Sequence, residues 1–326
     1  MRRRDTMVLA VLGLLSLFST TPAAQTPTVG DGKRIGWLST DQPSPALASY
    51  RDALRQALVG HVSLQRVAFE ERHVGNRLEQ LRAAASELAR LKVNAFLAVG
   101  HEAGRAALQA TNSIPIVVLA SDPVAAGLVK SLDDPGANVT GVAFDAAELS
   151  HRRVQILKEL VPKLSTLAVV GPGGSGTVEV QAITAAAKGL GIEARPLDAD
   201  KVRTLGLALL ATGPGKLDGL LVPVEPWLVA DARAVVELTV KHRLPAVYPF
   251  AEFTDEGGLV AYGPNLHAMY RRAGSYLGRV VNGVRPRELP VERPSRAELV
   301  VNLRAARALG LTVPRSLLGA ADRILE

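Results

Sequence analysis

Short aliphatic segments alternate with longer amphipathic segments along most of the chain, and this alternation restricts the fold more than any other feature. In the first half we expect strands at 34–38, 64–69, 94–99 and 114–119. Helices are expected between and after them, at 45–58, 76–91 and 102–110. Aliphatic strands that alternate with helices predict a parallel sheet with helices on both faces.

The same order restarts in the second half of the chain. Strands are expected at 166–170, 192–196, 219–222 and 246–248, and helices at 178–190, 201–211 and 228–242. A chain of 326 residues is longer than one hydrophobic core usually serves. We therefore predict an α/β fold with two Rossmann-like parallel-sheet lobes of similar size, joined near 138–144.

The last part of the chain is too small to be a third domain. It contains an expected strand at 259–262, a long helix at 265–281, a Pro-rich connection, a strand at 298–303 and a short helix at 305–309. We expect these pieces to join the two halves rather than form a domain of their own. The chain then crosses between the lobes three times, which gives a three-segment hinge. The predicted domains are 33–143 plus 264–288 for lobe 1, and 144–263 plus 289–326 for lobe 2.

The N-terminus has the layout of a secretory signal peptide, predicted for residues 1–24. Arg2, Arg3 and Arg4 precede an apolar run at 7–18, and small residues follow at 21–24. The run is about 12 residues long, short of the roughly 20 that a membrane-spanning helix needs. A degenerate twin-arginine signal and an uncleaved membrane anchor are the alternatives. We expect an exported, periplasmic protein.

Composition excludes several classes of function. The chain has no cysteine, which rules out disulfides, thiolate catalysis, cysteine-ligated zinc and a lipid-modified cysteine anchor. The net charge is +7, but the basic residues are scattered rather than gathered in a stripe with aromatic residues. We therefore expect no nucleic-acid partner.

Several segments, in this order, resemble ABC-transporter substrate-binding proteins with the type I periplasmic binding fold, in the branch that includes tryptophan- and tyrosine-type binders. They are RIGWLST at 34–40, SDPVAAGLV at 121–129, GANVTG at 136–141, HRLPAVYP at 242–249, EGGLVAYGPN at 256–265, LPVERP at 289–294, LVVNL at 299–303 and ALGLTVP at 308–314.

The resemblance implies a non-catalytic, monomeric protein without cofactor or metal, whose lobes close over a small polar or zwitterionic solute. The solute is then delivered to the permease subunits of an ABC transporter in the membrane. Ligands of such folds lie at the carboxyl ends of the strands, where helix N-termini point inward. The ligand-binding candidates at those positions are Ser39, Thr40, Asp41, His101, Glu102, Ser121, Asp122, Glu225, Trp227, Tyr248 and Phe250, with the loop at 171–176 beside them.

The polar candidates each have a second, structural interpretation. Thr40 and Ser121 can donate to a ligand carboxylate, or they can cap the next helix. Asp122 and Glu225 can hold a ligand ammonium group, although an Asp before a Pro is also an ordinary turn former.

This chain departs from the family at two loops. It has Gly-His-Glu at 100–102 where relatives usually carry Gly-Thr and a small residue, and Tyr-Pro-Phe at 248–250 where many have Tyr-Pro-Ser. His101 and Phe250 therefore change both the volume and the hydrogen-bonding groups of the pocket. Trp227 and Phe250 are expected either to form an apolar wall or to pack in the core. An amino acid with an aromatic or aliphatic side chain is the first choice of ligand; a nucleoside, purine-like or carboxylic-acid solute is the alternative.

Other functions have weaker support. The glycine-rich segment at 171–176 matches the G-x-G-x-x-G pattern of a dinucleotide-binding oxidoreductase, but Glu193 and Asp198 are poorly placed for the ribose contact. Ser175 lacks the G-x-S-x-G context of a hydrolase, and the six histidines show no metal-ligand spacing. A ligand-binding sensor of the same fold remains an alternative to transport.

Overall fold

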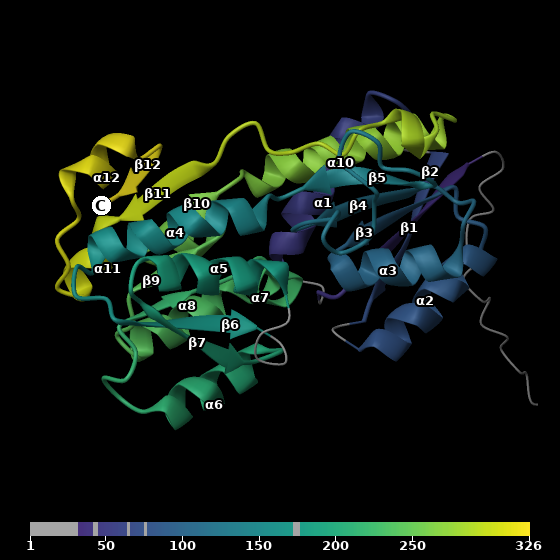
Figure 1. Ribbon diagram of the computed structural model, residues 1–326. Coiled ribbons are helices and arrows are strands. Elements are labelled where there is room, and N and C mark those ends of the chain that lie inside the picture. The colour runs from purple at the N-terminus through teal and green to yellow at the C-terminus, as the bar shows by residue number, and fades with distance from the viewer. Residues whose placement is uncertain (1–31, 42–44, 64–65, 75–76, 172–176) are drawn as a thin grey trace, which may run out of the picture.

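The computed structural model describes residues 32–41, 45–63, 66–74, 77–171 and 177–326. The signal peptide predicted at 1–24 and most of the predicted glycine-rich loop, at 172–176, lie outside these residues. Figure 1 shows two α/β lobes side by side, each built around its own sheet. The predicted fold class is confirmed.

The first sheet has five parallel strands in the order β2-β1-β3-β4-β5. Their bounds are β1 Lys33–Ser39, β2 Val67–His73, β3 Ala95–Val99, β4 Ile116–Ala120 and β5 Val139–Ala143. Helices α2 (Leu78–Arg90) and α3 (His101–Ala110) cover one face, and α1 (Pro45–Val59) and α10 (Leu266–Val281) cover the other (Figure 1). Successive residues of β3 enter the cores on opposite faces, which explains why its sequence is aliphatic throughout.

The second sheet has seven strands in the order β12-β11-β10-β9-β8-β6-β7, and only the β10–β11 pair is antiparallel. The strands are β6 Thr166–Gly171, β7 Glu193–Asp198, β8 Gly219–Leu221, β9 Ala246–Tyr248, β10 Val260–Gly263, β11 Glu298–Asn302 and β12 Arg323–Leu325. One face carries α4 Ala146–Leu160, α5 Val178–Gly189, α11 Leu303–Ala308 and α12 Arg315–Ala320. The other carries α6 Val202–Thr212, α7 Pro226–Ala230, α8 Ala232–Lys241 and α9 Ala251–Asp255.

The chain passes between the two sheets three times: from β5 to α4, from β10 to α10, and from the 3₁₀ helix Pro286–Glu288 to β11. The predicted three-segment hinge is therefore present. Helix α10 returns to lobe 1 and packs closely on α1, because Gly274 lies against the carbonyl group of Leu54 where a Cβ would collide.

The domain boundaries stay a prediction. The backbone N–H of Val291 donates to the carbonyl oxygen of Leu132, and that of Glu292 donates to Gly141. These bonds to lobe 1 favour a last boundary after residue 292 rather than at 288/289.

Three local predictions differ from the structure. The connection expected at 138–144 contains β5, whose residues are fully buried beside β4. The single helix expected at 228–242 is two helices, because Asp231 has non-helical dihedral angles between α7 and α8. Strand β2 begins at Val67 and continues to His73, four residues beyond the end expected at 69.

Among the described residues, the helices are all too short or too polar to cross a membrane.

Candidate ligand-binding site

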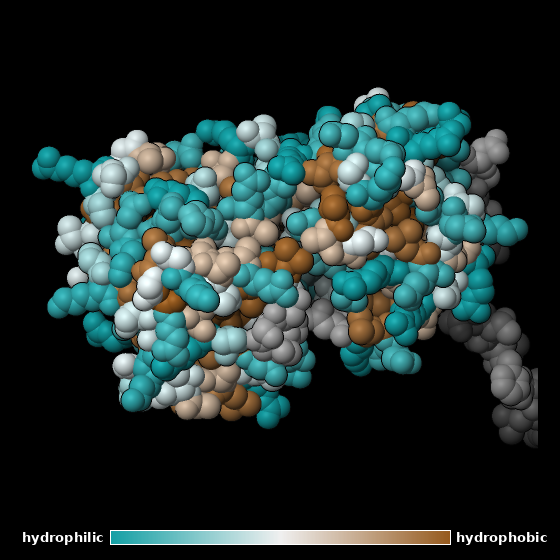
Figure 2. Space-filling view, in the orientation of Figure 1, coloured by the Kyte–Doolittle hydropathy of each residue, from teal (hydrophilic) through white to brown (hydrophobic). Residues whose placement is uncertain are grey.

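A cleft of about 280 Å³ lies between the lobes, at the carboxyl ends of strands from both sheets. Figure 2 shows a constriction between the two lobes, with hydrophobic residues on both sides of it. The loops after β1, β3 and β4 line the cleft from lobe 1, and the loops after β8 and β9 line it from lobe 2. Parallel sheets place ligands at this edge, because the strands end there and the following helices begin.

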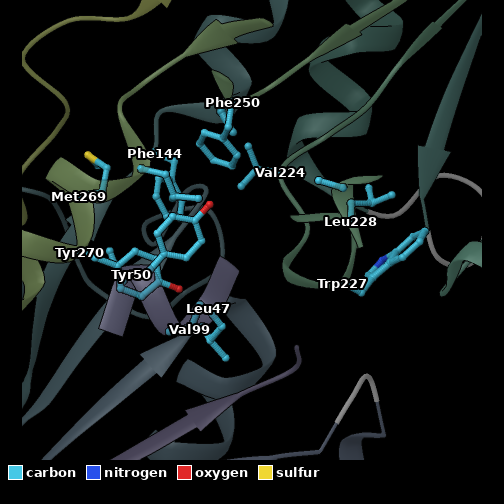
Figure 3. Close-up of a cluster of buried hydrophobic side chains, with 14 of the residues drawn as sticks. Leu47, Tyr50, Val99, Phe144, Val224, Trp227, Leu228, Phe250, Met269 and Tyr270 are labelled. Carbon is cyan, nitrogen blue, oxygen red and sulfur yellow. The ribbon is translucent and has the colours of Figure 1, made fainter. Parts of the chain in front are cut away.

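Aromatic rings form the apolar side of the cleft. Tyr50 on α1 and Tyr270 on α10 are stacked, with ring centroids 5.1 Å apart and planes inclined by 13°. Phe144, directly after β5, meets Phe250, two residues after β9, edge to face at 5.7 Å. Figure 3 shows these four side chains together. Both lobes contribute rings, so a flat apolar group in the cleft would contact both.

The polar side of lobe 1 includes the first turn of α3, which carries His101 and Glu102 into the cleft. Gly100 precedes this helix with φ +94°, a conformation that favours glycine. The Nε2 atom of His101 accepts from the backbone N–H of Asp122 at 3.1 Å, so the ring is neutral with its hydrogen on Nδ1. Burial, and then the charge of Arg105, lower the pKa of His101 to about 4.

A hydrogen bond joins the lobes at the cleft: the hydroxyl of Ser121 donates to the carbonyl oxygen of Val224 at 3.3 Å. The side chains of Tyr50 in lobe 1 and Glu252 in lobe 2 are also hydrogen-bonded. Glu225, the residue after Val224, also lines the cleft. Burial, and then the carboxylates of Glu179 and Glu102, raise the pKa of Glu225 to about 8.

A buried ion pair supports the lobe 2 side of the cleft. Arg153 on α4 lies 2.8 Å from the carboxylate of Glu179 on α5, and its Nε donates to the carbonyl oxygen of Tyr262. The second carboxylate oxygen of Glu179 accepts from the backbone N–H of Val224 at 2.8 Å. We call this group the arginine network. It connects Tyr262 in β10, the strand before the second crossing, to Val224 at the cleft.

A second buried group supports the lobe 1 side. The Nδ1 atom of His73, at the end of β2, lies 2.9 Å from the carboxylate of Asp41, and its Nε2 lies 3.2 Å from Glu71. Ser39 also donates to Asp41. Burial lowers the pKa of His73, but the hydrogen bonds and charges of Asp41 and Glu71 outweigh burial and raise it. We call this group the histidine network.

The family model for ABC transporter substrate binding proteins matches residues 44–325. The chain belongs to this family. Its members bind a small-molecule ligand and deliver it to ABC permeases, and those that serve importers are periplasmic or extracellular. The cleft between two hinged lobes is the site where such a protein holds its solute.

Several relatives are similar over nearly the whole chain. A tyrosine-binding protein of Clostridioides difficile is 25% identical over 284 residues, covering 86% of this chain and 81% of the relative. The ABC domain in complex with L-Trp from Streptococcus pneumonia has a TM-score of 0.78 at 21% identity, covering 89% of this chain and all of that one. A conserved domain protein from Vibrio cholerae has a TM-score of 0.80 at 22% identity, covering 90% and 99%.

The structure brings most of the predicted binding residues of this substrate-binding protein into the cleft. Those that line it are Thr40, Asp41, His101, Glu102, Ser121, Glu225 and Phe250.

Four predicted binding residues do not line the cleft. Ser39 is buried behind it and bonds to Asp41. The carboxylate of Asp122 accepts from the N–H groups of Val124 and Ala125, so Asp122 has the turn-forming role and not the ligand-binding one. Trp227 packs in the core, away from the four aromatic rings (Figure 3), and the hydroxyl of Tyr248 bonds to Thr239 at 2.7 Å.

Sequence reasoning missed the aromatic residues Tyr50, Tyr270 and Phe144 and the supporting His73. Tyr50 and Tyr270 lie within helices whose apolar faces gave no sign that part of the face borders a cavity. Phe144 directly follows an aliphatic strand, and recognising β5 as a strand would have identified it.

Proposed function

We propose that this substrate-binding protein captures an amino acid with an aromatic side chain for import. The proposal rests on one observation above the others: rings from both lobes, Tyr50 and Tyr270 with Phe144 and Phe250, face one cleft that also carries polar groups. Relatives named for tyrosine binding and solved with L-Trp support the same class of ligand.

Each part of such a ligand has matching groups in the cleft. The aromatic side chain would pack against the four rings. The carboxylate would accept from the unpaired N–H groups of the first turn of α3, with the hydroxyl of Thr40 nearby. The ammonium group would lie near the carboxylates of Glu225 and Asp41. Closure of the lobes would then exclude water from these contacts.

The protein would act as an exported monomer that presents the loaded lobes to the permease subunits of its transporter. The N-terminal layout of basic, apolar and small residues supports export through a signal peptide at 1–24. The absence of cysteine supports a freely diffusing protein rather than a lipid-anchored one.

A thermal-shift and calorimetry screen tests the ligand class. We expect L-tyrosine, L-tryptophan or L-phenylalanine to stabilise the purified mature protein by about 2.7 kcal/mol at 100 times the dissociation constant. L-leucine should bind more weakly, and nucleosides should not bind. Stabilisation by a nucleoside or by a simple carboxylic acid, without any by the aromatic amino acids, would contradict the proposal.

Substitutions at the two loops that depart from the family test the position of the site. His101→Thr and Phe250→Ser should change the ranking of the affinities for the three aromatic amino acids. Because Phe250 is buried, Phe250→Leu serves as a milder change that keeps an apolar side chain. An unchanged order of affinities in all three variants would place the ligand elsewhere.

A further inference from the structure

Two carboxylates face the cleft from opposite lobes. Glu102 lies in the first turn of α3 in lobe 1, and Glu225 lies at the N-terminus of α7 in lobe 2. Among the described residues, the side chain of Glu225 has neither a hydrogen-bond nor an ion-pair partner. We call these two residues the cleft carboxylate pair.

The charges around Glu225 do not compensate it. Glu179 lies behind it and is already paired with Arg153, while Glu102 pairs at 3.2 Å with Arg105, one turn further along α3. His101 is neutral, and Asp41 is bonded to His73. Glu225 is half-buried in the empty cleft. Once a solute fills the closed cleft and excludes water, an ionised Glu225 would therefore be an unpaired charge near the carboxylates of Glu179 and Glu102, which is unfavourable.

This cost depends on whether the lobes are together. Separation of the lobes would hydrate Glu225 and move it away from Glu102, since the two residues belong to different lobes. Closure must then either add a proton to Glu225 or place a cation beside it. A carboxylic solute without an amine can supply neither.

Given the proposed amino-acid ligand, we propose that the cleft carboxylate pair selects solutes with an ammonium group by making closure over any other solute require a proton. When the ligand brings its own positive charge, Glu225 stays ionised and pairs with it. When the ligand lacks that charge, Glu225 takes one proton from solution, and the complex contains a neutral carboxyl group instead.

Proton counting by calorimetry tests this inference. L-tyrosine and its desamino analogue, 3-(4-hydroxyphenyl)propionate, are titrated at pH 7 in buffers of different ionisation enthalpy. Because the free protein is common to both titrations, the analogue should bind with about one more proton than L-tyrosine, whether the free lobes are open or closed. The ratio of the analogue's dissociation constant to that of L-tyrosine should rise about tenfold per pH unit between about pH 5 and pH 8. The analogue should bind most tightly at low pH, so its dissociation constant is measured first near pH 5.5.

Variants identify the group that takes the proton. Glu225→Gln should abolish the difference in proton number, because glutamine cannot titrate. Glu102→Gln should keep the difference but move the rise in the ratio to lower pH. Glu237→Gln is the matched control, since Glu237 is exposed on α8 and pairs with Arg233. An equal proton number for both ligands in the wild-type protein, or a difference that survives Glu225→Gln, would overturn the inference.

A measurement without ligand separates this inference from the proposed function. If neither compound binds, the proposed ligand class is wrong, and small-angle scattering of the empty protein then tests the pair. The wild-type radius of gyration should increase from pH 5 to pH 9 by more than that of Glu225→Gln, in which another charged contact between the lobes, His267 with Glu252, remains. A wild-type radius that increases no more than that of the variant would overturn the role of the pair.

Discussion

The two lobes support the cleft with buried networks of different chemistry. In lobe 2 the arginine network joins backbone atoms of Tyr262 and Val224 through the ion pair of Arg153 and Glu179. In lobe 1 the histidine network holds Asp41 beside the cleft through His73, whose ring lies between two carboxylates. The first network depends on a guanidinium that keeps its charge at any physiological pH, whereas the second depends on an imidazole that can lose it.

This difference teaches how one cleft can be supported by a network of fixed charge in one lobe and by a titratable network in the other. Arg153 is fully buried and bonds atoms near a chain crossing, so its network fixes the position of the loop that bears Val224 and Glu225. His73 can satisfy both carboxylates only when both ring nitrogens carry hydrogen. We therefore expect the arginine network behind the lobe 2 side to be insensitive to pH, and the histidine network behind the lobe 1 side to depend on it.

The largest effect should come from breaking the arginine network. Arg153→Met leaves Glu179 buried without its cation and should lower the free energy of unfolding by about 3–5 kcal/mol, measured by urea denaturation. The double variant Arg153→Met/Glu179→Met should recover part of this loss, because no unpaired charge remains buried. Arg233→Met, which breaks an exposed pair with Glu237, is the control and should cost less than about 0.5 kcal/mol. A similar loss of unfolding free energy in Arg153→Met and Arg233→Met would show that the buried network stabilises the fold no more than an exposed ion pair does.

Breaking the histidine network should have a smaller effect that depends on pH. His73→Gln removes charged hydrogen bonds and should lower the free energy of unfolding by about 2 kcal/mol at pH 6. Because the pKa of His73 is raised in the folded protein, the stabilisation is complete below the unfolded value of about 6.5 and is lost as pH rises through the folded pKa. Urea denaturation at pH 6 and pH 9 measures the change.

The exposed His151, on α4, provides the control for that experiment. His151→Gln should leave the pH dependence of stability as it is in the wild-type protein. If His73→Gln costs the same stability at pH 6 and pH 9, the lobe 1 network does not titrate and the contrast between the lobes fails.

The smallest effect should come from the hydrogen bond of Ser121, one of those that join the two lobes. Ser121→Ala removes the hydrogen bond to the carbonyl oxygen of Val224, which belongs to the closed lobes. We expect the affinity for L-tyrosine to fall about fivefold, corresponding to about 1 kcal/mol. The free energy of unfolding should change by less than about 0.5 kcal/mol. Calorimetry and urea denaturation of the same variant separate the two effects, and a loss of stability without loss of affinity would contradict the assignment.

The sequence alone determined the fold class, the three crossings and most of the polar cleft residues. Aliphatic strands buried on both faces and the helices between them are local patterns, readable without distant contacts. Thr40, His101 and Glu225 were found because each lies in the loop or first helical turn after a parallel strand, and the end of the strand fixes where the following residues lie.

Only the tertiary structure decided which side chains meet. Tyr50 and Tyr270 are separated by more than 200 residues of chain, and their stacking depends on α10 returning to α1 after the second crossing. Trp227 lies in the first turn of the helix that follows β8, and Tyr248 is the last residue of β9, yet both side chains point into the core, where they pack with residues of α7, α8 and α9. A strand end fixes the position of a residue, but the neighbours that enclose a side chain come from distant segments, and no local pattern contains them.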